Sequence, residues 1–403
     1  MNILIVSHQF YPLNSPRAFR WKSIYDDLKN KGHTVKIITG TFQEKANDDI
    51  FFIGNQKSKT FINNVRTRSN QVDSNKMFIN FIYLILKKVY RLFYKTFAWP
   101  DYSMFWLYSV WKNRKHIDYQ YDVIISVSLP FSSHLAAYIL NKKNQKKWIM
   151  DIGDPFSLKE NAYENNKYLY KYLNFYIEKK FYNIAHQIIF THKESSDSHI
   201  KYFKINKEKI YIGSPISTFN DELFEASKSY KYNTLPIKLG YFGVLTKGVR
   251  SPENTLKFFK NSDFEFNWYT NPDSKLMVTQ NKINLDNHKF FDMVSRDEAL
   301  DKMTSSLHCL LSIGNLNPGQ LPSKIIEYIS TGKPVIHFAE IDDDPVIQIS
   351  KQFNNLIIVN TDSNLPELED KLNNIFLNID TFNKETFIKN YSAGAITSNL
   401  DIL

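Results

Sequence analysis

A lysine and a glutamate, Lys324 and Glu327, lie one helical turn apart at the start of a helix that the sequence predicts over 322–331. Pro322 suits the first turn of a helix, because its missing N–H would have no partner there. The loop at 314–320 separates this helix from a buried strand, and a helix start in such a place offers free backbone N–H groups to an anion. A cation and a carboxylate on one face beside these groups suit the phosphates and ribose hydroxyls of a nucleoside diphosphate.

A second group of candidate phosphate ligands follows the strand predicted over 237–242. Gly243 begins a turn, and the cations Lys247 and Arg250 come after it, ahead of the next helix. We favour Arg250, because a guanidinium at a helix start can make bidentate contacts with phosphate. The sequence contains neither GxxxxGK(S/T) nor GxGxxG, so neither ATP hydrolysis nor NAD binding is indicated.

Four further candidates follow strands predicted in the first half. Arg17 and Arg20 open the first helix, where they could be solvated or could contact a leaving phosphate or an anionic acceptor. An arginine in the first turn opposes the helix dipole, which favours a bound anion. His134 lies near a helix start, a position that lowers a histidine's pKa and keeps the ring neutral and able to hydrogen-bond. Asp154 precedes a proline and could either bind a sugar hydroxyl or cap a turn.

Several of these segments resemble the retaining GT-B glycosyltransferases grouped as glycosyltransferase family 4. The run PSKIIEY at 322–328, followed by GKPV at 332–335, is similar to the family's donor-site helix. In the first half, YP at 11–12, GHTV at 32–35 and DIGDP at 151–155 are similar to the family's cleft loops. The resemblance covers essentially the whole chain, and its strongest segments lie in the C-terminal half.

The resemblance implies a role for each candidate residue. Arg250 and Lys324 would stabilise the departing diphosphate of a sugar donor, and Glu327 would bind its ribose. His134 and Asp154 would position the donor sugar and the acceptor. The other candidates would line the donor site, at Gly243, Lys247, Asn317 and Ser323, or the acceptor side, at Arg17 and Arg20.

Some positions depart from the family's pattern. Gly319 stands where a glutamate contacts the donor sugar, so this contact would come from Asn315 or Asn317, or be absent. Val244 stands where the family has an arginine of the diphosphate clamp. In the motif that begins at Asp151, Gly153 stands where the family has an arginine and Phe156 where it has a tryptophan.

The composition is that of a globular protein with excess positive charge. The 403 residues are 43% hydrophobic and 23% charged, and they suffice for two ordinary domains. The single cysteine, Cys309, excludes an internal disulfide and favours a reducing cytoplasm; we expect no metal cofactor, and we see no signal peptide at the start. The net charge of +10 predicts an anionic partner, which we expect to be nucleotide and lipid rather than nucleic acid.

Aromatic, apolar and basic residues concentrate at 75–95. The apolar run at 77–86 is about half as long as a bilayer span, and cations follow it at Lys87, Lys88, Arg91 and Lys95. One interpretation is a buried helix whose basic stripe faces water. The other is an interfacial helix on anionic lipid, which predicts peripheral attachment to the inner face of the cell membrane.

Short apolar segments alternate with helical ones in both halves, which predicts α/β domains with parallel sheets covered on both faces. With the resemblance, this implies the GT-B fold, two doubly wound Rossmann-like domains facing each other across a cleft. The expected bounds are 1–215 for the acceptor-side domain, 216–236 for a linker, 237–385 for the nucleotide-sugar domain and 386–403 for a C-terminal helix that packs back on the first domain.

The resemblance therefore implies a retaining, metal-independent glycosyltransferase of hexosyl- or N-acetylhexosaminyltransferase type. Its donor would be a nucleoside diphosphate sugar, and its acceptor a polyprenyl-linked saccharide in capsule or O-antigen assembly. Two alternatives stay open: a GT-B nucleotide-sugar epimerase, and a non-catalytic, membrane-associated nucleotide-binding protein of the same fold.

Overall fold

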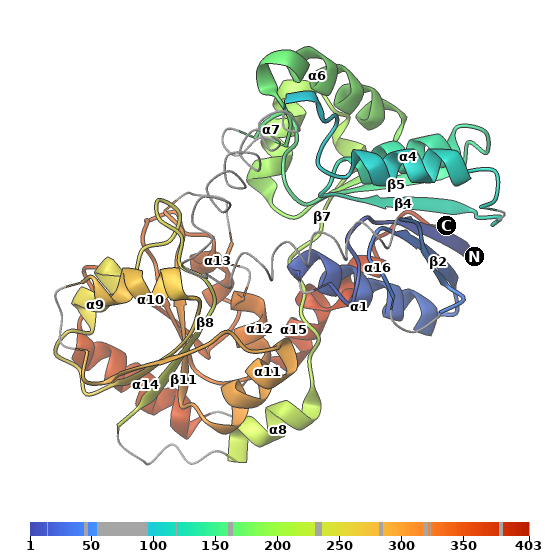
Figure 1. Cartoon of the computed structure of the whole chain (residues 1–403). Helices are drawn as coiled ribbons and strands as arrows, with labels where there is room; N and C mark the ends of the chain where they lie inside the picture. The colour runs from blue at the N-terminus through green and yellow to red at the C-terminus, as the bar shows by residue number, and fades with distance from the viewer. Residues whose placement is uncertain are drawn as a thin grey trace, which may run out of the picture. The chain divides into compact units, whose positions relative to one another are not determined.

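The computed structural model of the chain describes residues 1–13, 15–43, 47–54, 96–117, 119–159, 164–229, 236–281, 285–316, 321–322, 324–378 and 382–402. The chain divides into two compact units, one of Met1–Gly213 with Ile396–Leu403 and the other of Ser214–Ala395 (Figure 1). The first unit is discontinuous, because a short stretch that follows the whole second unit in sequence belongs to it.

The first unit contains a seven-stranded parallel sheet of order β3-β2-β1-β4-β5-β6-β7. Its strands are β1 (Asn2–Val6), β2 (Thr34–Thr39), β3 (Ile50–Phe52), β4 (Val123–Val127), β5 (Lys147–Ile152), β6 (Gln187–Phe190) and β7 (Ile210–Ile212). Its helices are α1 (Pro16–Asn30), α4 (Met104–Asn113), α5 (Ser132–Asn141), α6 (Lys167–Ile184) and α7 (Lys193–Phe203). The strand order reverses between β1 and β4, and ligands of doubly wound sheets bind outside the carboxyl ends of the strands at such a switch point.

Helices cover both faces of this sheet (Figure 1). Leu4 of β1 lies in one apolar cluster with Trp106 of α4 and Phe181 of α6. Its neighbours Ile3 and Ile5, whose side chains point to the opposite face, are also fully buried. A strand covered on both faces needs apolar residues at every position, which explains the unbroken apolar sequence of β1.

Helix α1 begins at the carboxyl end of β1 and places two arginines there. The Ser15 hydroxyl accepts a hydrogen bond from the backbone N–H of Ala18 (3.2 Å), and Pro16 is the first helical residue. Arg17 and Arg20 therefore lie in the first turn and a half. The helix is held to the sheet by buried side chains at helical spacing: Trp21, Ile24 and Leu28.

The second unit contains a six-stranded parallel sheet of order β10-β9-β8-β11-β12-β13. Its strands are β8 (Lys238–Phe242), β9 (Glu265–Tyr269), β10 (His288–Phe291), β11 (Cys309–Ile313), β12 (Val335–Phe338) and β13 (Leu356–Val359). Its helices are α8 (Asp221–Ser229), α9 (Glu253–Phe258), α10 (Pro272–Thr279), α11 (Arg296–Ser305), α12 (Ile325–Ser330), α13 (Val346–Ser350), α14 (Leu365–Leu377) and α15 (Lys384–Tyr391), and α16 (Ala393–Thr397) leads back to the first unit.

The two parallel α/β sheets agree with the sequence prediction, and the differences lie in short elements. The sequence does not predict strand β3, because three residues are too few to show a pattern. The expected linker at 216–236 contains α8, whose Phe224 packs into the core of the second unit. The expected C-terminal helix is two helices, α15 and α16, interrupted where Ser392 is extended.

The helix predicted over 322–331 is also shorter than predicted. It begins at Ile325 rather than Pro322, and Lys324 is its N-cap residue. The turn at its start is closed by a hydrogen bond from the Ile325 N–H to the Pro322 carbonyl (3.1 Å). Among the described residues, no helix has both the length and the hydrophobicity that a membrane crossing requires.

Candidate functional site

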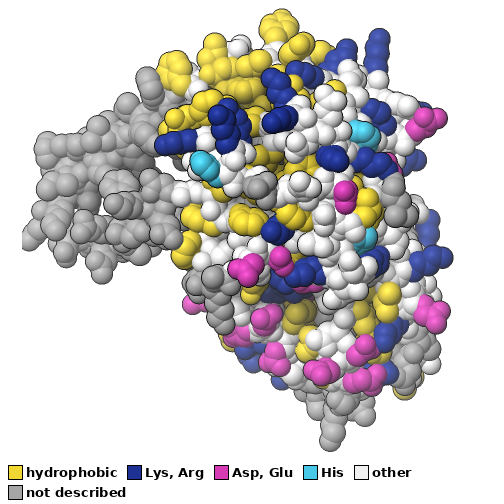
Figure 2. Space-filling model, turned by 90° about the vertical axis from the view of Figure 1, so that its right-hand side faces the viewer, with side chains coloured by type: hydrophobic (Ala, Val, Ile, Leu, Met, Phe, Trp, Pro, Cys, Tyr) yellow, Lys and Arg dark blue, Asp and Glu magenta, His cyan; other side chains and the backbone are white. Residues whose placement is uncertain are grey.

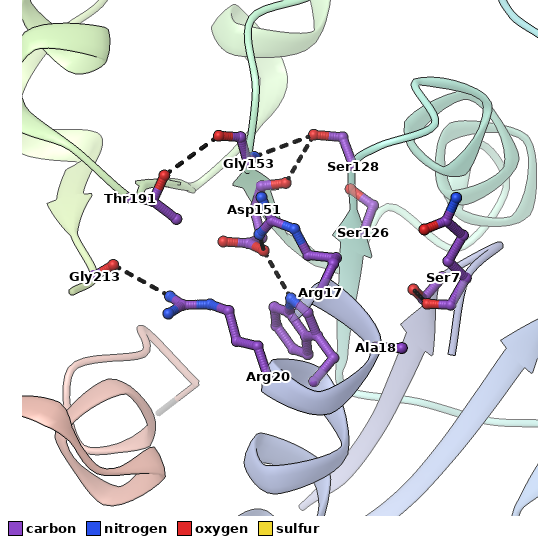
Figure 3. Close-up of polar contacts among 12 residues, drawn as sticks. Ser7, Arg17, Ala18, Arg20, Ser126, Ser128, Asp151, Gly153, Thr191 and Gly213 are labelled. Atoms are coloured by element: carbon purple, nitrogen blue, oxygen red, sulfur yellow. Dashed lines mark hydrogen bonds and ion pairs between the residues drawn. The ribbon is translucent and has the colours of Figure 1, made fainter. Parts of the chain in front are cut away.

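A fully buried carboxylate, that of Asp151, lies at the carboxyl end of β5 in the first unit. Its Oδ2 accepts from Arg17 Nη1 at 2.5 Å and from Trp21 Nε1 at 2.7 Å, so both donors come from the start of α1 (Figure 3). Its other oxygen, Oδ1, is buried and has no hydrogen-bond partner among the described residues. The ion pair therefore joins the first turn of α1 to the end of a strand far away in sequence and leaves one acceptor available.

The guanidinium of Arg17 occupies space that a side chain at position 153 would need. A Cβ atom added to Gly153 would lie 1.1 Å from Arg17 Nη2 and 2.1 Å from Arg17 Cζ. Gly153 itself is held in place, because its carbonyl accepts from the Thr191 hydroxyl at 3.3 Å (Figure 3). Position 153 is one where the resembled family carries an arginine, and here an arginine from α1 brings a guanidinium to the same place.

Arg20 is buried and contacts Gly213, where the chain leaves the first unit. Its Nη2 donates to the carbonyl of Gly213 at 3.2 Å. Burial lowers the pKa of Arg20 to about 10, while the charge of Asp151 acts in the opposite direction. Both predicted acceptor-side arginines therefore have partners within the first unit, and the side chain of Arg17 keeps 17% of its surface exposed. Their contact with an acceptor stays a prediction.

His134 is fully buried in the first turn of α5. Its Nδ1 lies 2.6 Å from the Ser126 hydroxyl, which also accepts from Trp148 Nε1 at 2.8 Å. Its Nε2 is buried without a hydrogen-bond partner in the part of the chain that the structure describes. Burial, and to a smaller extent the charge of Arg17, lower the pKa of His134 to about 3. The ring is neutral, as expected, but burial rather than the helix start is the main cause.

The start of α5 is held by Asp101, a residue that the sequence analysis did not identify as a candidate. Asp101 is fully buried, and its two oxygens accept from the backbone N–H and the hydroxyl of Ser132, each at 2.8 Å. Burial raises the pKa of Asp101, although these hydrogen bonds act against the rise. By contrast, Asp154 lies exposed in the turn after β5. Its contact with a sugar hydroxyl stays a prediction.

In the second unit, Glu327 lies in the first turn of α12 with both carboxylate oxygens paired. Oε2 accepts from Lys324 Nζ at 2.6 Å, and Oε1 accepts from Arg296 Nε at 2.7 Å. Only 7% of Glu327 is exposed. The lysine was predicted, whereas Arg296, the first residue of α11, was missed. The signal that drew attention to Arg17, an arginine in the first turn of a helix, is present at Arg296 too.

Arg250 lies in the turn that follows β8, close to the loop after β11. Its Nη2 and Nε lie 2.8 Å and 3.2 Å from Asn315 Oδ1, and the two loops are also joined by a hydrogen bond from Leu316 N–H to the Val249 carbonyl (2.7 Å). Lys247, the other candidate cation, is exposed in the same turn. Asn315, which the sequence suggested as a sugar contact, is thus a partner of the candidate phosphate ligand.

The remaining donor-site candidates are Gly243, Asn317 and Ser323. Gly243 directly follows β8 with φ +157°, and its carbonyl accepts from the Thr270 hydroxyl at 2.6 Å. Asn317 and Ser323 lie outside the described residues, as does Gly319, the position that departs from the family's pattern. Within the described ranges, no three histidine, cysteine, aspartate or glutamate side chains gather closely enough to hold a metal ion.

Comparisons with known proteins connect this chain to others by structure. No protein-family model and no curated protein matches the sequence. Among solved structures, sucrose-phosphate synthase from Thermosynechococcus elongatus is similar with a TM-score of 0.61 at 10% identity, covering 98% of this chain and 96% of that one. Anabaena HepE in complex with UDP and glucose has a TM-score of 0.58 at 9% identity, covering 99% and 97%. A glycosyltransferase from Rickettsia africae has a TM-score of 0.54 at 14% identity, covering 99% of each chain.

At these identities the likeness shows the fold. The chain has the GT-B fold, with a parallel α/β sheet in each of its two units, and the fold class predicted from the sequence is confirmed. In a GT-B protein the carboxyl ends of the strands are where ligands bind. The Arg17–Asp151 and Glu327–Lys324–Arg296 groups lie at these ends in the first and second unit.

Substituting Gly153 tests whether Arg17 can pair with Asp151 only because position 153 has no side chain. Gly153→Ala should displace the guanidinium and leave Asp151 without its cation, as Arg17→Ala does. Arg17→Ala should lose about 3 kcal/mol of unfolding free energy in urea, because a buried charge loses its partner. Gly153→Ala should lose no more than this, because the end of a flexible side chain can shift away from the added Cβ. The double variant should be no less stable than the worse single variant, since both changes break one interaction. Additive losses would show that the two positions act separately.

The buried imidazole of His134 predicts a change in the acid stability of the protein. The folded-state pKa, about 3, lies below the usual 6.5, so the unfolded chain binds an extra proton between these values. Stability from this group is complete above pH 6.5 and is lost as the pH falls towards 3, by up to about 1.4 kcal/mol per pH unit. His134→Asn should flatten this dependence in urea titrations, and His116→Asn, at an exposed position, should not. An unchanged slope in His134→Asn would contradict the assignment.

Proposed function

We propose that this protein is a glycosyltransferase that moves a sugar from a nucleoside diphosphate sugar to a hydroxyl acceptor. The observation that carries the proposal is the nearly buried carboxylate of Glu327 at the start of α12, with Lys324 and Arg296 bound to it. This is the residue set that would bind ribose hydroxyls and phosphates at the carboxyl edge of a Rossmann-like unit. A protein of the same fold, HepE, is described with UDP and with UDP-glucose, which supports a nucleotide-sugar donor.

The paired state of Glu327 suggests how a donor would bind. Each carboxylate oxygen can accept a second hydrogen bond, so two ribose hydroxyls would donate to Glu327 while Lys324 and Arg296 keep theirs. The same two cations would face the diphosphate, as would Arg250 from the turn after β8. The buried carboxylate keeps its cations, so binding avoids the cost of leaving a charge unpaired.

The reaction we propose is transfer with retention of configuration and without a metal. The bond between the sugar C1 and the phosphate oxygen breaks toward an oxocarbenium-like state, and the acceptor oxygen bonds to C1 on the same face. The acceptor's proton passes to the departing phosphate oxygen. Arg250 and Lys324 stabilise the negative charge that grows on the diphosphate, which is where fixed cations act most strongly.

The first unit would supply the acceptor side. His134 stays neutral at physiological pH and can take part through hydrogen bonds alone, while Asp154 and Arg17 keep surface exposed to solvent. We propose a polyprenyl-linked saccharide of capsule or O-antigen assembly as the acceptor, and a cytoplasmic enzyme attached to the inner face of the membrane. The segment 75–95, expected to make that attachment, lies outside the described residues, and its role stays a prediction.

One observation favours a second candidate, a non-catalytic nucleotide-binding protein of the same fold. Glu327 already has both oxygens paired, and Val244 stands where the resembled family carries a phosphate-binding arginine. A protein of this kind would bind UDP or GDP but release no nucleoside diphosphate from any sugar donor. A panel of nucleoside diphosphate sugars assayed for release of the diphosphate separates the two candidates.

Removing the Glu327 carboxylate should weaken nucleotide binding. Glu327→Ala is expected to lose about 1.5–3 kcal/mol of binding free energy by calorimetry, the range for hydrogen bonds to a charged group. The matched control is Glu265→Ala, which removes another ion-paired carboxylate, bound to Lys289 at 2.7 Å at the opposite edge of the sheet. A folded Glu327→Ala protein with unchanged affinity would exclude the ribose assignment.

The cations should act on the rate of transfer. Arg250→Ala and Lys324→Ala should each lower kcat by roughly two to three powers of ten, because they stabilise charge that grows in the transition state. Lys289→Ala, distant from this edge, should leave kcat unchanged, and EDTA should leave wild-type activity intact. Activity that EDTA removes and a divalent ion restores would show that a metal stabilises the diphosphate instead.

A further inference from the structure

Helix α6 presents a row of tyrosines to solvent that the fold of the first unit does not use. Tyr168, Tyr172 and Tyr176 recur every four residues and are 98%, 83% and 63% exposed. The helix packs on the sheet through other positions, among them Phe181 and Tyr182, which are fully buried. A row of large apolar rings at a spacing of i, i+4 and i+8 forms one continuous stripe along a helix.

The charges that accompany this stripe are all positive. Lys167, Lys171 and Lys179 are exposed beside the tyrosines. Glu178 is the sole acidic residue of α6, and it is buried, where its two oxygens accept from the Tyr182 hydroxyl at 2.7 Å and the Ser157 N–H at 3.0 Å. The solvent face of α6 is therefore both aromatic and basic.

Helix α4 presents a face of the same kind. Phe105, Tyr108 and Trp111 are 62%, 59% and 46% exposed. Basic residues follow at Lys112, Arg114 and Lys115, without an acidic residue between 102 and 117, and the Arg114 guanidinium lies 4.7 Å from the Trp111 ring centroid.

The two helices cover the same face of the sheet. Trp106 of α4 and Phe181 of α6 belong to one apolar cluster, and the Tyr170 hydroxyl of α6 donates to the carbonyl of Phe97, ahead of α4, at 3.1 Å. In Figure 2 the uppermost surface, over α6, carries hydrophobic side chains interspersed with lysine and arginine. Aromatic and basic side chains from two helices thus reach solvent on one side of the first unit.

We propose that the exposed faces of α6 and α4 dock the first unit on an anionic phospholipid bilayer. Tyrosine and tryptophan suit the boundary between headgroups and acyl chains, because each has an apolar ring and a polar group. Lysines keep their ammonium groups in water at that depth and are attracted to anionic lipid. The uniform positive charge favours a negatively charged surface over a second copy of this basic chain.

A cavity beside the start of α6 fits this orientation. It has a volume of about 220 Å³ and is lined by Lys159, Lys167 and Lys171 together with the apolar rings of Phe156 and Phe175. Lys159 is paired with Glu164 at 2.8 Å, which leaves the lining with a net positive charge. On the docked surface this cavity would receive the phosphate of a lipid headgroup.

The residues of this surface are neither those of the segment at 75–95 nor those proposed for sugar transfer, so the surface can be tested without activity. The full chain is mixed with phosphatidylglycerol or phosphatidylcholine vesicles and sedimented. Wild-type protein should pellet with the anionic vesicles and be released by high salt. Tyr168→Ser/Tyr172→Ser/Tyr176→Ser should bind roughly tenfold or more weakly, and Lys167→Gln/Lys171→Gln/Lys179→Gln on the order of 100-fold more weakly.

Matched controls remove exposed apolar side chains and exposed lysines from the second unit, in the same numbers. Leu276→Ser/Met293→Ser/Leu377→Ser and Lys260→Gln/Lys351→Gln/Lys371→Gln should pellet as the wild type does. Circular dichroism and nucleotide binding should be unchanged in every variant that is compared. If the tyrosine variant fails to fold, the lysine variant alone decides.

Three outcomes would overturn the proposal. In the first, the wild type does not pellet with anionic vesicles, and in the second, both α6 variants pellet as well as the wild type. In the third, binding is abolished only by the variant Lys87→Gln/Lys88→Gln/Arg91→Gln/Lys95→Gln, which would assign the attachment to 75–95. A change in oligomeric state on losing the tyrosines, without any vesicle binding, would identify the surface as a contact between copies of the chain.

Discussion

The arrangement of side chains at the carboxyl ends of the first unit's strands depends on the charge of Asp151. A carboxylate without exposed surface is costly unless donors surround it, and the donors here, Arg17 and Trp21, both belong to α1. The ion pair therefore ties the first turn of α1 to the end of β5 and leaves part of Arg17 exposed to solvent. The same helix brings Arg20 to the carbonyl of Gly213.

The second unit uses the same arrangement with a different consequence. Glu327 is also nearly buried and held by cations, one from its own turn and one, Arg296, from another helix. Asp151 keeps a buried oxygen without a partner among the described residues, whereas both oxygens of Glu327 are paired. Oδ1 of Asp151 therefore has both lone pairs open to a ligand, whereas each oxygen of Glu327 has one left. A ligand can add a donor at either group, and at the second it does so with Lys324 and Arg296 in place.

The sequence predicted the parts of the site that are close together along the chain. Lys324 and Glu327 share one helical turn, and the buried strands are long enough to show their apolar pattern, so the strand predicted over 237–242 matches β8 to within one residue at its start. The partners that come from distant elements were not predictable: Arg296 for Glu327, Asp101 for the start of α5, and Arg17 in the space left by Gly153. Each is a single residue whose meaning depends on a packing geometry that no local pattern encodes.

The discontinuity of the first unit has a consequence for the order in which the protein can fold. Residues from Ile396 onward bind strands and helices made much earlier: Lys31 Nζ donates to Thr397 Oγ1 at 2.5 Å, and Gln187 Nε2 donates to the Asn399 carbonyl at 2.9 Å. During synthesis, the first unit must wait for these partners until all of 214–395 has been made. The second unit, made without interruption, can complete its core first, although it comes later in the sequence. A single cut after Gly213 would leave the second unit continuous and covalently attached to the last segment of the first unit.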